Sequence, residues 1–317
     1  MELITIDDIE AAAARIGDLV VRTPLLPCLW AEPERPLWLK PEQLQPIGAF
    51  KIRGAANAIG RLPDDVRARG VVAYSSGNHA QAVAYVARLH GVPATIVVTT
   101  NTPLVKVEAT RRHGAEVLIV PPADRESAAE EVVAKGGGTL IPPFDHPDVI
   151  AGQGTVGLEI AADLPDVEVV LVPVSGGGLI SGVAAAIKAK APHARVVGVE
   201  PELAGDTAEG FRTGLRPDWS TDARARTIAD GLRSTPSELT FAHVRKLVDD
   251  VVTVTEDQIK DAIGLLATRS QVVAEPSGAV TTAAYLHADL PAGRTVAVNS
   301  GGNIDPALLA EILTTRI

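Results

Sequence analysis

Short apolar runs rich in β-branched residues alternate with amphipathic segments along most of the chain. Between residues 71 and 142, such runs lie at 71–74, 94–98 and 116–120. Each is followed by a segment of helical periodicity, at about 78–90, 103–113 and 125–135. Runs that are apolar on both faces are typical of parallel strands covered by helices on each side. The pattern predicts a small α/β unit in this part of the chain.

A second series of apolar runs lies at 167–174, 194–200, 251–254 and 295–299. These runs also alternate with helical segments, and Thr255 followed by two acidic residues marks one helix start. The stretch 201–226 is richer in Gly, Asp, Arg and Thr, which predicts an irregular excursion. Alternating strands and helices of this kind predict an α/β fold with doubly wound sheets.

The composition permits a large core and limits the partners. The 317 residues are 46% hydrophobic, which suits two domains or one large one. The formal net charge of −10 argues against nucleic acid and anionic membranes as partners. The single cysteine, Cys28, allows no disulfide within the chain. The sequence has no signal peptide and no apolar run long enough to span a bilayer, so a cytoplasmic protein is expected.

Three turns that follow apolar runs carry small and polar residues suited to anions. The turn 175–178 has three consecutive glycines and opens a predicted helix, where free N–H groups and the helix dipole attract a phosphate. The turn 75–79 also opens a helix and suits a carboxylate, since a plain N-cap explains only one of its polar residues. The third turn is 300–303. Ligands of open α/β sheets bind at the carboxyl ends of strands, so all three turns can face one crevice.

Other uses of the glycine turn remain open. It could be a tight turn without a ligand. A dinucleotide fingerprint fits Gly176 and Gly178 but has Ser181 where the third glycine is needed. Glu200 could then serve as the acid that binds the ribose, which keeps a nicotinamide enzyme as a competitor.

Lys51 follows Phe50 at the start of a predicted helix of about 50–58. Most lysines are solvated surface charges, and in isolation that reading is favoured. A lysine held out of water has a lowered pKa and becomes a nucleophilic amine. The three turns offer what an aldehyde cofactor with a phosphate tail requires, so Lys51 is a candidate to react with such a cofactor.

Together these segments resemble the fold-type-II pyridoxal-phosphate (PLP) enzymes, and among them the serine/threonine dehydratase and serine racemase family. The likeness extends from about residue 5 to residue 305, and its motifs are the segments 40–51, 75–79, 151–155, 173–179, 227–231, 275–276 and 300–303. It implies a tryptophan synthase β-like fold of two doubly wound open sheets with helices on both faces. The implied domains are a large PLP-binding domain of residues 1–65 and 146–317 and a small mobile domain of residues 66–145.

The resemblance implies roles for individual residues. Lys51 is the expected attachment point of pyridoxal 5′-phosphate and the expected base, and Ser76 is the hydroxyl expected on the opposite face of the substrate Cα. The other cofactor-binding residues expected are Phe50, Asn78, Ser175, Gly176, Gly177, Gly178, Leu179, Glu275 and Ser300. The substrate-binding residues expected are Ser75, Ser76, Asn78, His79 and Arg125. Ser300 in place of an aspartate at the ring nitrogen makes the ring a weaker electron sink, which suits prompt loss of a β-hydroxyl.

The resemblance also implies a divalent-cation site. Its ligands are Glu200, the main-chain carbonyl of Ala204, and Asp206, which suit Mg²⁺ or Ca²⁺ because hard cations prefer oxygen. The alternative is a solvated acidic loop. Ile47 and Ala49 depart from the family pattern and are expected to reshape the mouth of the site.

The activity that the resemblance implies is the conversion of L-threonine and L-serine to 2-oxobutyrate or pyruvate plus ammonia. The rivals are a serine or aspartate racemase, a 3-hydroxyaspartate dehydratase, and a non-catalytic binding protein without a cofactor. A homodimer is expected, with a small amino acid as substrate and no nucleic acid or membrane partner. Isoleucine feedback is not expected, since no regulatory domain of the biosynthetic threonine dehydratases follows residue 305.

Overall fold

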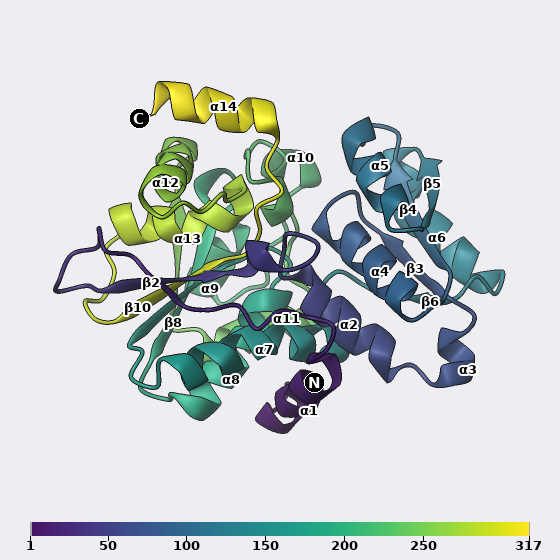
Figure 1. Cartoon of the computed structure of the whole chain (residues 1–317), viewed down its shortest axis with the longest axis horizontal. Coiled ribbons are helices and arrows are strands. Elements are labelled where there is room, and N and C mark those ends of the chain that lie inside the picture. Colours follow the sequence, from purple (N-terminus) through teal and green to yellow (C-terminus); the bar gives the residue numbers. More distant parts are fainter. Residues whose placement is uncertain (1, 317) are drawn as a thin grey trace.

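The computed structural model describes residues 2–316 and contains two β-sheets flanked by helices (Figure 1). The larger sheet has the strand order β1 (Leu26–Pro27), β2 (Leu37–Pro41), β10 (Thr295–Asn299), β7 (Val169–Pro173), β8 (Arg195–Pro201) and β9 (Asp250–Val254). The smaller has the order β5 (Glu116–Val120), β4 (Ala94–Thr99), β3 (Val71–Tyr74) and β6 (Thr139–Leu140). Only β1 and β2 pair antiparallel among the strands of residues 2–316. The predicted α/β class with two open sheets is confirmed.

Most helices connect consecutive strands of these sheets. They are α1 (Ile6–Ile16), α2 (Lys51–Arg61), α3 (Asp64–Arg67), α4 (Asn78–Leu89), α5 (Leu104–Arg112), α6 (Arg125–Ala134), α7 (Pro147–Asp163), α8 (Gly178–Lys190), α9 (Asp206–Thr213), α10 (Thr221–Arg224), α11 (Glu238–Leu247), α12 (Glu256–Arg269), α13 (Pro276–His287) and α14 (Pro306–Thr315). Short 3₁₀ turns are η1 (Glu42–Leu44), η2 (Pro122–Asp124), η3 (Glu202–Ala204) and η4 (Asp230–Leu232). Capping boxes at Thr5, Ser237 and Thr255 fix three helix starts. No helix in the described part of the chain is long and apolar enough to cross a membrane.

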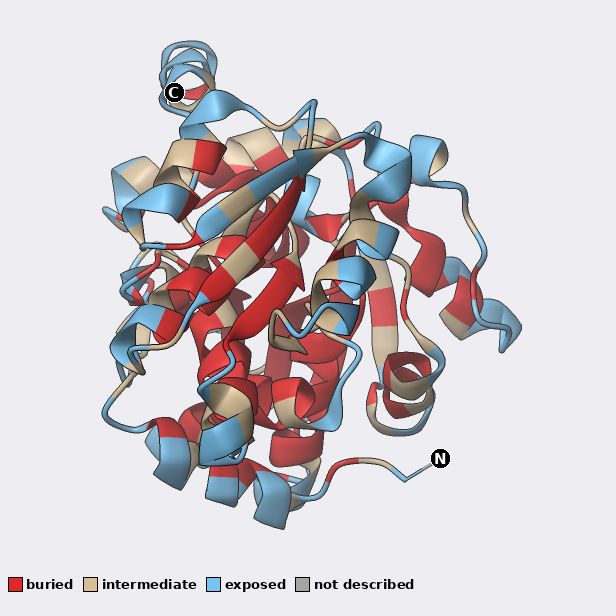
Figure 2. Cartoon of the chain, turned by 90° about the vertical axis from the view of Figure 1, so that its right-hand side faces the viewer, coloured by how far each residue is buried: buried red, intermediate tan, exposed pale blue. Residues whose placement is uncertain are grey.

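The large sheet is buried on both faces because its strands alternate between two cores. Val296 and Val298 of β10 join a cluster with residues of α7 and α8, whereas Ala297 joins the cluster on the side of α12 and α13. Val296, Ala297 and Val298 are each 0% exposed. Figure 2, viewed from the side of the smaller sheet, shows buried strands flanked by helices whose outer sides are exposed. β2 and β10 lie side by side at opposite ends of the sequence, so the sheet closes only when both ends of the chain have folded (Figure 1).

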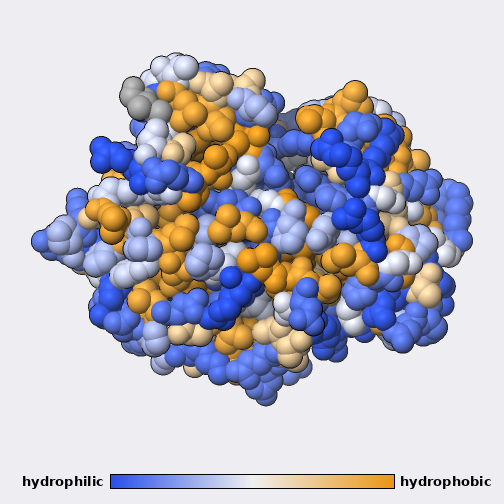
Figure 3. Space-filling view, in the orientation of Figure 1, coloured by the Kyte–Doolittle hydropathy of each residue, from blue (hydrophilic) through white to orange (hydrophobic). Residues whose placement is uncertain are grey.

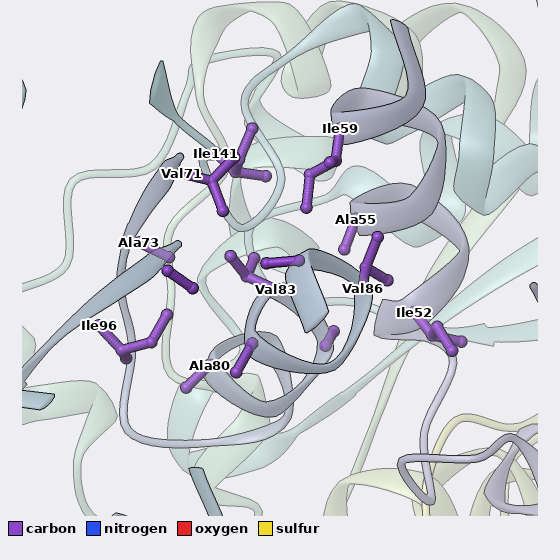
Figure 4. Close-up of a cluster of buried hydrophobic side chains, with 14 of the residues drawn as sticks. Ile52, Ala55, Ile59, Val71, Ala73, Ala80, Val83, Val86, Ile96 and Ile141 are labelled. Atoms are coloured by element: carbon purple, nitrogen blue, oxygen red, sulfur yellow. The ribbon is translucent and has the colours of Figure 1, made fainter. Parts of the chain in front are cut away.

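A third core joins α2 to the small sheet. Ile52, Ala55 and Ile59 of α2 lie with residues of α4 and β3 in one buried cluster (Figure 4). The segment that begins with Lys51 therefore packs against the four-stranded unit as well as the six-stranded one. The domain boundaries at 65/66 and 145/146 stay a prediction.

One feature of the predicted strands is wrong. β5 was expected to be covered on both faces, but Leu118 and Ile119 are 37% and 48% exposed. β5 is the outer strand of its sheet, whereas β4 lies between α4 on one face and α6 on the other. β2 and β6 were not expected, since each is too short or too mixed in polarity to give a strand pattern.

Candidate functional site

Lys51 is positioned by backbone contacts with the end of β10. The amide of Phe50 donates to the carbonyl of Ser300 (3.0 Å), and the amide of Gly302 donates to the carbonyl of Gly48 (2.9 Å). These contacts bring the segment before Lys51 against the turn 300–303, as expected of strand-end turns facing one crevice.

The amine of Lys51 lies in a poorly solvated position. Its Nζ donates to the carbonyl of Pro143 at 2.7 Å and lies 5.2 Å from the centre of the Phe50 ring. Burial lowers the pKa of Lys51 from 10.5 to about 8, because the ammonium ion loses hydration there. A considerable fraction of the amine is therefore neutral near physiological pH, which is what a nucleophile or a general base needs.

The glycine turn presents free backbone donors at the start of α8. Gly176, Gly177 and Gly178 are buried, and their amides meet no acceptor within residues 2–316. Buried amides without partners are rare, and at a helix start they attract an anion. Gly177 has φ of 84°, a conformation that L side chains rarely adopt.

Phe144 explains why the other two positions are glycine. A Cβ on Gly176 would lie under 3.0 Å from its ring, and a Cβ on Gly178 would lie 2.9 Å from its Cβ. Sequence reasoning did not identify Phe144 or the Pro143 carbonyl. Both follow β6 in a connector to α7, and no spacing along the chain places this connector against the glycine turn.

The turn before α4 brings together most of the predicted carboxylate-binding group. Ser75, Ser76 and Asn78 are partly exposed at the start of the helix, and Ser75 Oγ accepts from the amide of Gly77 (3.2 Å). The imidazole of His79 does not join them. It is 3% exposed, its Nε2 contacts the carbonyl of Ile141 at 2.8 Å, and burial, then the Lys51 charge, lowers its pKa to about 3. His79 is thus neutral, and only its backbone amide at the helix start suits a carboxylate.

Asn78 and Glu275 connect the two sheets beside Lys51. Asn78 Nδ2 donates to Glu275 Oε1 (2.7 Å), and Asn78 Oδ1 accepts from Asn303 Nδ2 (2.7 Å). Burial, and then the charge of Asp230, raises the pKa of Glu275 to about 7. Asn303 was part of a predicted turn, but its contact with Asn78 was not foreseen.

The side chains of the remaining predicted site residues contact neighbouring groups of the protein. Ser175 Oγ accepts from the amide of Ser234 (3.0 Å), and Leu179 packs its side chain into the core beneath α8. Ser300 is 3% exposed, and its hydroxyl donates to the carbonyl of Ser277 (3.4 Å). Arg125 lies 5.5 Å above the ring of Tyr74, at the end of β3, and pairs with the adjacent Glu126.

Ile47 and Ala49 do not line the mouth of the site. They are 4% and 0% exposed, respectively, and both belong to the core shared by α2 and α4. The expectation that they reshape the mouth is wrong, because both side chains are buried in that core. Ala49 pairs with Gly301 in an isolated bridge, and the carbonyl of Ile47 accepts from Asn303 Nδ2 (2.9 Å).

The expected metal ligands lie together in a buried loop. Glu200 accepts from the amides of Thr207 (3.3 Å) and Ala208 (2.8 Å), and Asp206 Oδ2 is buried without a partner among residues 2–316. Burial, then the charge of Asp206, raises the pKa of Glu200 well above its ordinary value. No group of three or more His, Cys, Asp or Glu side chains suited to a metal occurs in the described residues. A cation here would also need the Ala204 carbonyl and water.

A hollow lies between the half that carries α10 and α14 and the half that carries α4 and α5 (Figure 3). Lys106 of α5 forms an ion pair with Asp230 of η4, so the two halves are in contact. The site just described combines strand ends from both halves.

Residues 16–301 match a family model described as pyridoxal-phosphate-dependent enzyme. The chain belongs to this family. An L-threonine ammonia-lyase from Thermotoga maritima is 44% identical over 317 residues, which cover 98% of this chain and 78% of that protein. An L-threo-3-hydroxyaspartate ammonia-lyase from Saccharomyces cerevisiae is 40% identical over 319 residues, 98% of this chain and 97% of that protein. The structure of maize serine racemase matches with a TM-score of 0.91 at 38% identity, covering 99% of this chain and 98% of that one. The expected family and cofactor class are confirmed.

The residues present fit pyridoxal phosphate. The unpartnered amides of 176–178 suit its phosphate, and the Lys51 amine, with its pKa of about 8, suits its aldehyde. Both groups contact the same connector, since Lys51 bonds Pro143 and the glycines pack on Phe144.

Proposed function

We propose that this PLP-dependent enzyme is an ammonia-lyase that converts L-threonine and L-serine to 2-oxobutyrate or pyruvate and ammonia. The observation that carries the proposal is the poorly solvated Lys51 amine, which bonds the connector that packs on the glycine turn at the start of α8. Its charge also lowers the pKa of His79 at the start of α4. The resemblance to a threonine ammonia-lyase of 44% identity supports the choice of substrate.

We assign the cofactor to the large half of the site. Gly176, Gly177 and Gly178 would hold its phosphate, and Phe50 would pack against its ring. Asn78 would approach the ring from the small sheet, kept in orientation by Glu275 and Asn303. When bound, the cofactor would supply an aldehyde for the substrate amine and a ring that withdraws electrons from Cα.

Residues of the chain would carry out the remaining work. The amides and hydroxyls at residues 75–79 bind and orient the substrate carboxylate. Lys51 Nζ, neutral in part because of its lowered pKa, accepts the proton from Cα. The hydroxyl leaves as water, and hydrolysis of the released enamine gives the 2-oxo acid and ammonia, so the reaction needs no oxidant. Ser300 presents a hydroxyl and no charge at the end of β10, which suits prompt elimination.

A substrate panel with detection of 2-oxo acids tests this proposal. We expect product from L-threonine and L-serine. We also expect Lys51→Ala to lose about 10²-fold or more in rate, whereas Lys188→Met, a lysine far from the site, keeps the wild-type rate. Lyase activity retained by Lys51→Ala would contradict the mechanism. A purified protein without yellow absorbance and without turnover would favour the non-catalytic reading.

Two other activities have an observation in their favour. Ser76 Oγ makes no hydrogen bond within residues 2–316 and is partly exposed, which suits a second acid–base group for racemisation. D-serine in excess of pyruvate from L-serine would select this reading. Arg125 carries a charge at the end of β3, which suits a second carboxylate. A higher kcat/KM for 3-hydroxyaspartate than for threonine would select that one.

We also propose a Mg²⁺ or Ca²⁺ site at Glu200, Ala204 and Asp206, supported by the unpartnered Asp206 oxygen. A cation there would stabilise the loop after β8 and take no part in the chemistry. A homodimer is proposed from the family resemblance, and size-exclusion chromatography with light scattering tests it. A cytoplasmic location is proposed from the sequence, whose single cysteine fits a reducing compartment.

A further inference from the structure

Four charged side chains form a buried cluster behind the first turn of α2. Arg53 Nε donates to Glu42 Oε2 (2.7 Å), and Arg53 Nη1 donates to Glu159 Oε1 (2.7 Å). Lys40 Nζ donates to Glu159 Oε2 (2.6 Å) and to the carbonyl of Thr23 (2.6 Å). Lys40, Glu42 and Arg53 are 0% exposed and Glu159 is 9% exposed. We call this set the buried quartet.

Burial of the quartet costs hydration free energy that an apolar core of the same size would not lose. Each buried charge loses several kcal/mol of hydration, and replacement of such clusters by packed apolar side chains is often neutral or stabilising. Glu42 stays ionised, because Arg53 holds its pKa below its ordinary value although burial alone would raise it. Unlike an apolar core, the quartet fixes the orientation of its side chains, since the planar guanidinium of Arg53 bonds two carboxylates at fixed angles.

Arg53 and Lys51 lie on nearly opposite sides of α2. Two residues correspond to a turn of about 200° around a helix axis. Lys51 faces the connector that carries Pro143, whereas Arg53 contacts η1 through Glu42 and α7 through Glu159. Arg53 also reaches Thr155 of α7 and the carbonyl of Val21. The guanidinium therefore ties the first turn of α2 to η1 and α7, and the orientation of that turn is what aims Lys51.

Packing also holds α2, since Ile52, Ala55 and Ile59 lie in the core shared with α4 and β3, and Asn57 Nδ2 donates to the carbonyl of Asp148 (2.7 Å). In the first turn, however, Arg53 is the side chain whose charged group bonds both η1 and α7. The start of α2 has no side-chain cap within the described residues. Its first turn is joined to residues 300–303 through backbone groups that precede Lys51. The Lys51 side chain itself bonds one group in residues 2–316, the Pro143 carbonyl.

We propose that Arg53, held by Lys40, Glu42 and Glu159, is the positioning residue that fixes the Lys51 amine in its desolvated place. The proposal rests on the proposed function only in taking Lys51 as the reactive amine. The quartet carries two positive and two negative charges. It therefore holds α2 without adding net charge beside Lys51, whose lowered pKa has burial as its cause.

The test measures Lys51 in the cofactor-free protein, independently of any turnover. Reductive methylation with formaldehyde is followed across pH by mass spectrometry of the Lys51 peptide. The wild-type midpoint is expected at about 8. Arg53→Lys keeps the charge and loses the planar fork, so Lys51 should become solvated and its midpoint should rise by about one pH unit. Lys188→Met removes an ion pair between the end of α8 and Asp249, just before β9, and serves as the control.

A second variant separates position from stability. Lys40→Met, Glu42→Gln, Arg53→Met and Glu159→Gln together remove every charge of the quartet and leave no charge unpaired. This variant should regain the melting temperature lost in Arg53→Lys, yet keep the raised Lys51 midpoint. In holoenzyme, Arg53→Lys should lower kcat by about 10²-fold with little change in KM, since substrate binds at the small sheet.

Three results would overturn the proposal. One is an unchanged midpoint in Arg53→Lys, and another is an equal shift in Lys188→Met. The third is a wild-type midpoint in the folded charge-free variant. If that variant does not fold, Arg53→Lys decides. A protein with a midpoint near 8 that lacks lyase activity would contradict the proposed function and leave the positioning role supported.

Discussion

Phe144 can be shown to shape the glycine turn by three alanine substitutions. In Gly176→Ala the new methyl group would meet the Phe144 ring, whereas in Gly178→Ala it would meet the Cβ and Cα of Phe144 at 2.9 and 3.1 Å. The ring is a side-chain group that Phe144→Ala removes. The Cα and Cβ remain in that variant. The two glycines therefore differ in whether truncation of Phe144 relieves the clash.

The expected energies follow from these distances. Ordinary contacts of a Cβ lie at 3.4–4 Å, so both methyl groups force a shift of neighbouring atoms. Overpacking of this kind costs about 1–3 kcal/mol. In the pair Gly176→Ala and Phe144→Ala we expect a favourable coupling energy of about 1–3 kcal/mol, and in the pair Gly178→Ala and Phe144→Ala a coupling near zero.

Urea unfolding of the cofactor-free variants measures both couplings, and titration with pyridoxal phosphate measures the effect on the site. Gly178→Ala should weaken cofactor binding more than Gly176→Ala, because it moves the backbone of the connector that carries Pro143. Gly17→Ala is the control, since its Cβ would make an ordinary contact at 3.5 Å. Equal coupling energies for the two glycines would refute this account of the turn.

Three further predictions concern titration, metal and contact between the halves. The pKa of Glu275 is about 7 in the fold and 4.5 without it, so its contribution to stability is full below pH 4.5 and is lost as pH rises through 7. The loss is at most about 3 kcal/mol. In Glu275→Gln the free energy of unfolding should depend less on pH over this range. A pH dependence equal to that of the wild type would contradict the assignment. After treatment with EDTA, addition of Mg²⁺ or Ca²⁺ should raise the melting temperature of the wild type but not that of Asp206→Asn. At an ion concentration of 100 times Kd, the gain in stability should be about 2.7 kcal/mol. No gain with either ion would exclude the proposed site. Lys106→Met should change the free energy of unfolding by less than about 1 kcal/mol, since its ion pair with Asp230 is solvated. Hydrogen exchange of the amides in residues 141–147 should nevertheless become faster. Exchange as slow as in the wild type would show that the ion pair does not hold the two halves together.

The strands and turns of the site were predictable because their signals are local. The runs 71–74, 116–120 and 295–299 coincide with β3, β5 and β10, and the turns after them are polar and small. β2 was not foreseen, because its residues alternate little and its strand character comes from pairing with β10 at the other end of the chain. His79 was grouped with the carboxylate-binding side chains, and only its burial beside Ile141 shows otherwise.

The sequence by itself determined the α/β class and the three strand-end turns, since these depend on residues adjacent in the chain. The candidacy of Lys51 followed from those turns together with the family resemblance. Tertiary structure alone decided the contacts between distant segments. Lys51 meets Pro143, Asn78 meets Glu275, and Arg53 meets Glu159, across separations of 92, 197 and 106 residues. The lowered pKa of Lys51 has the same origin, because a lysine loses its hydration only when segments far along the chain close around it.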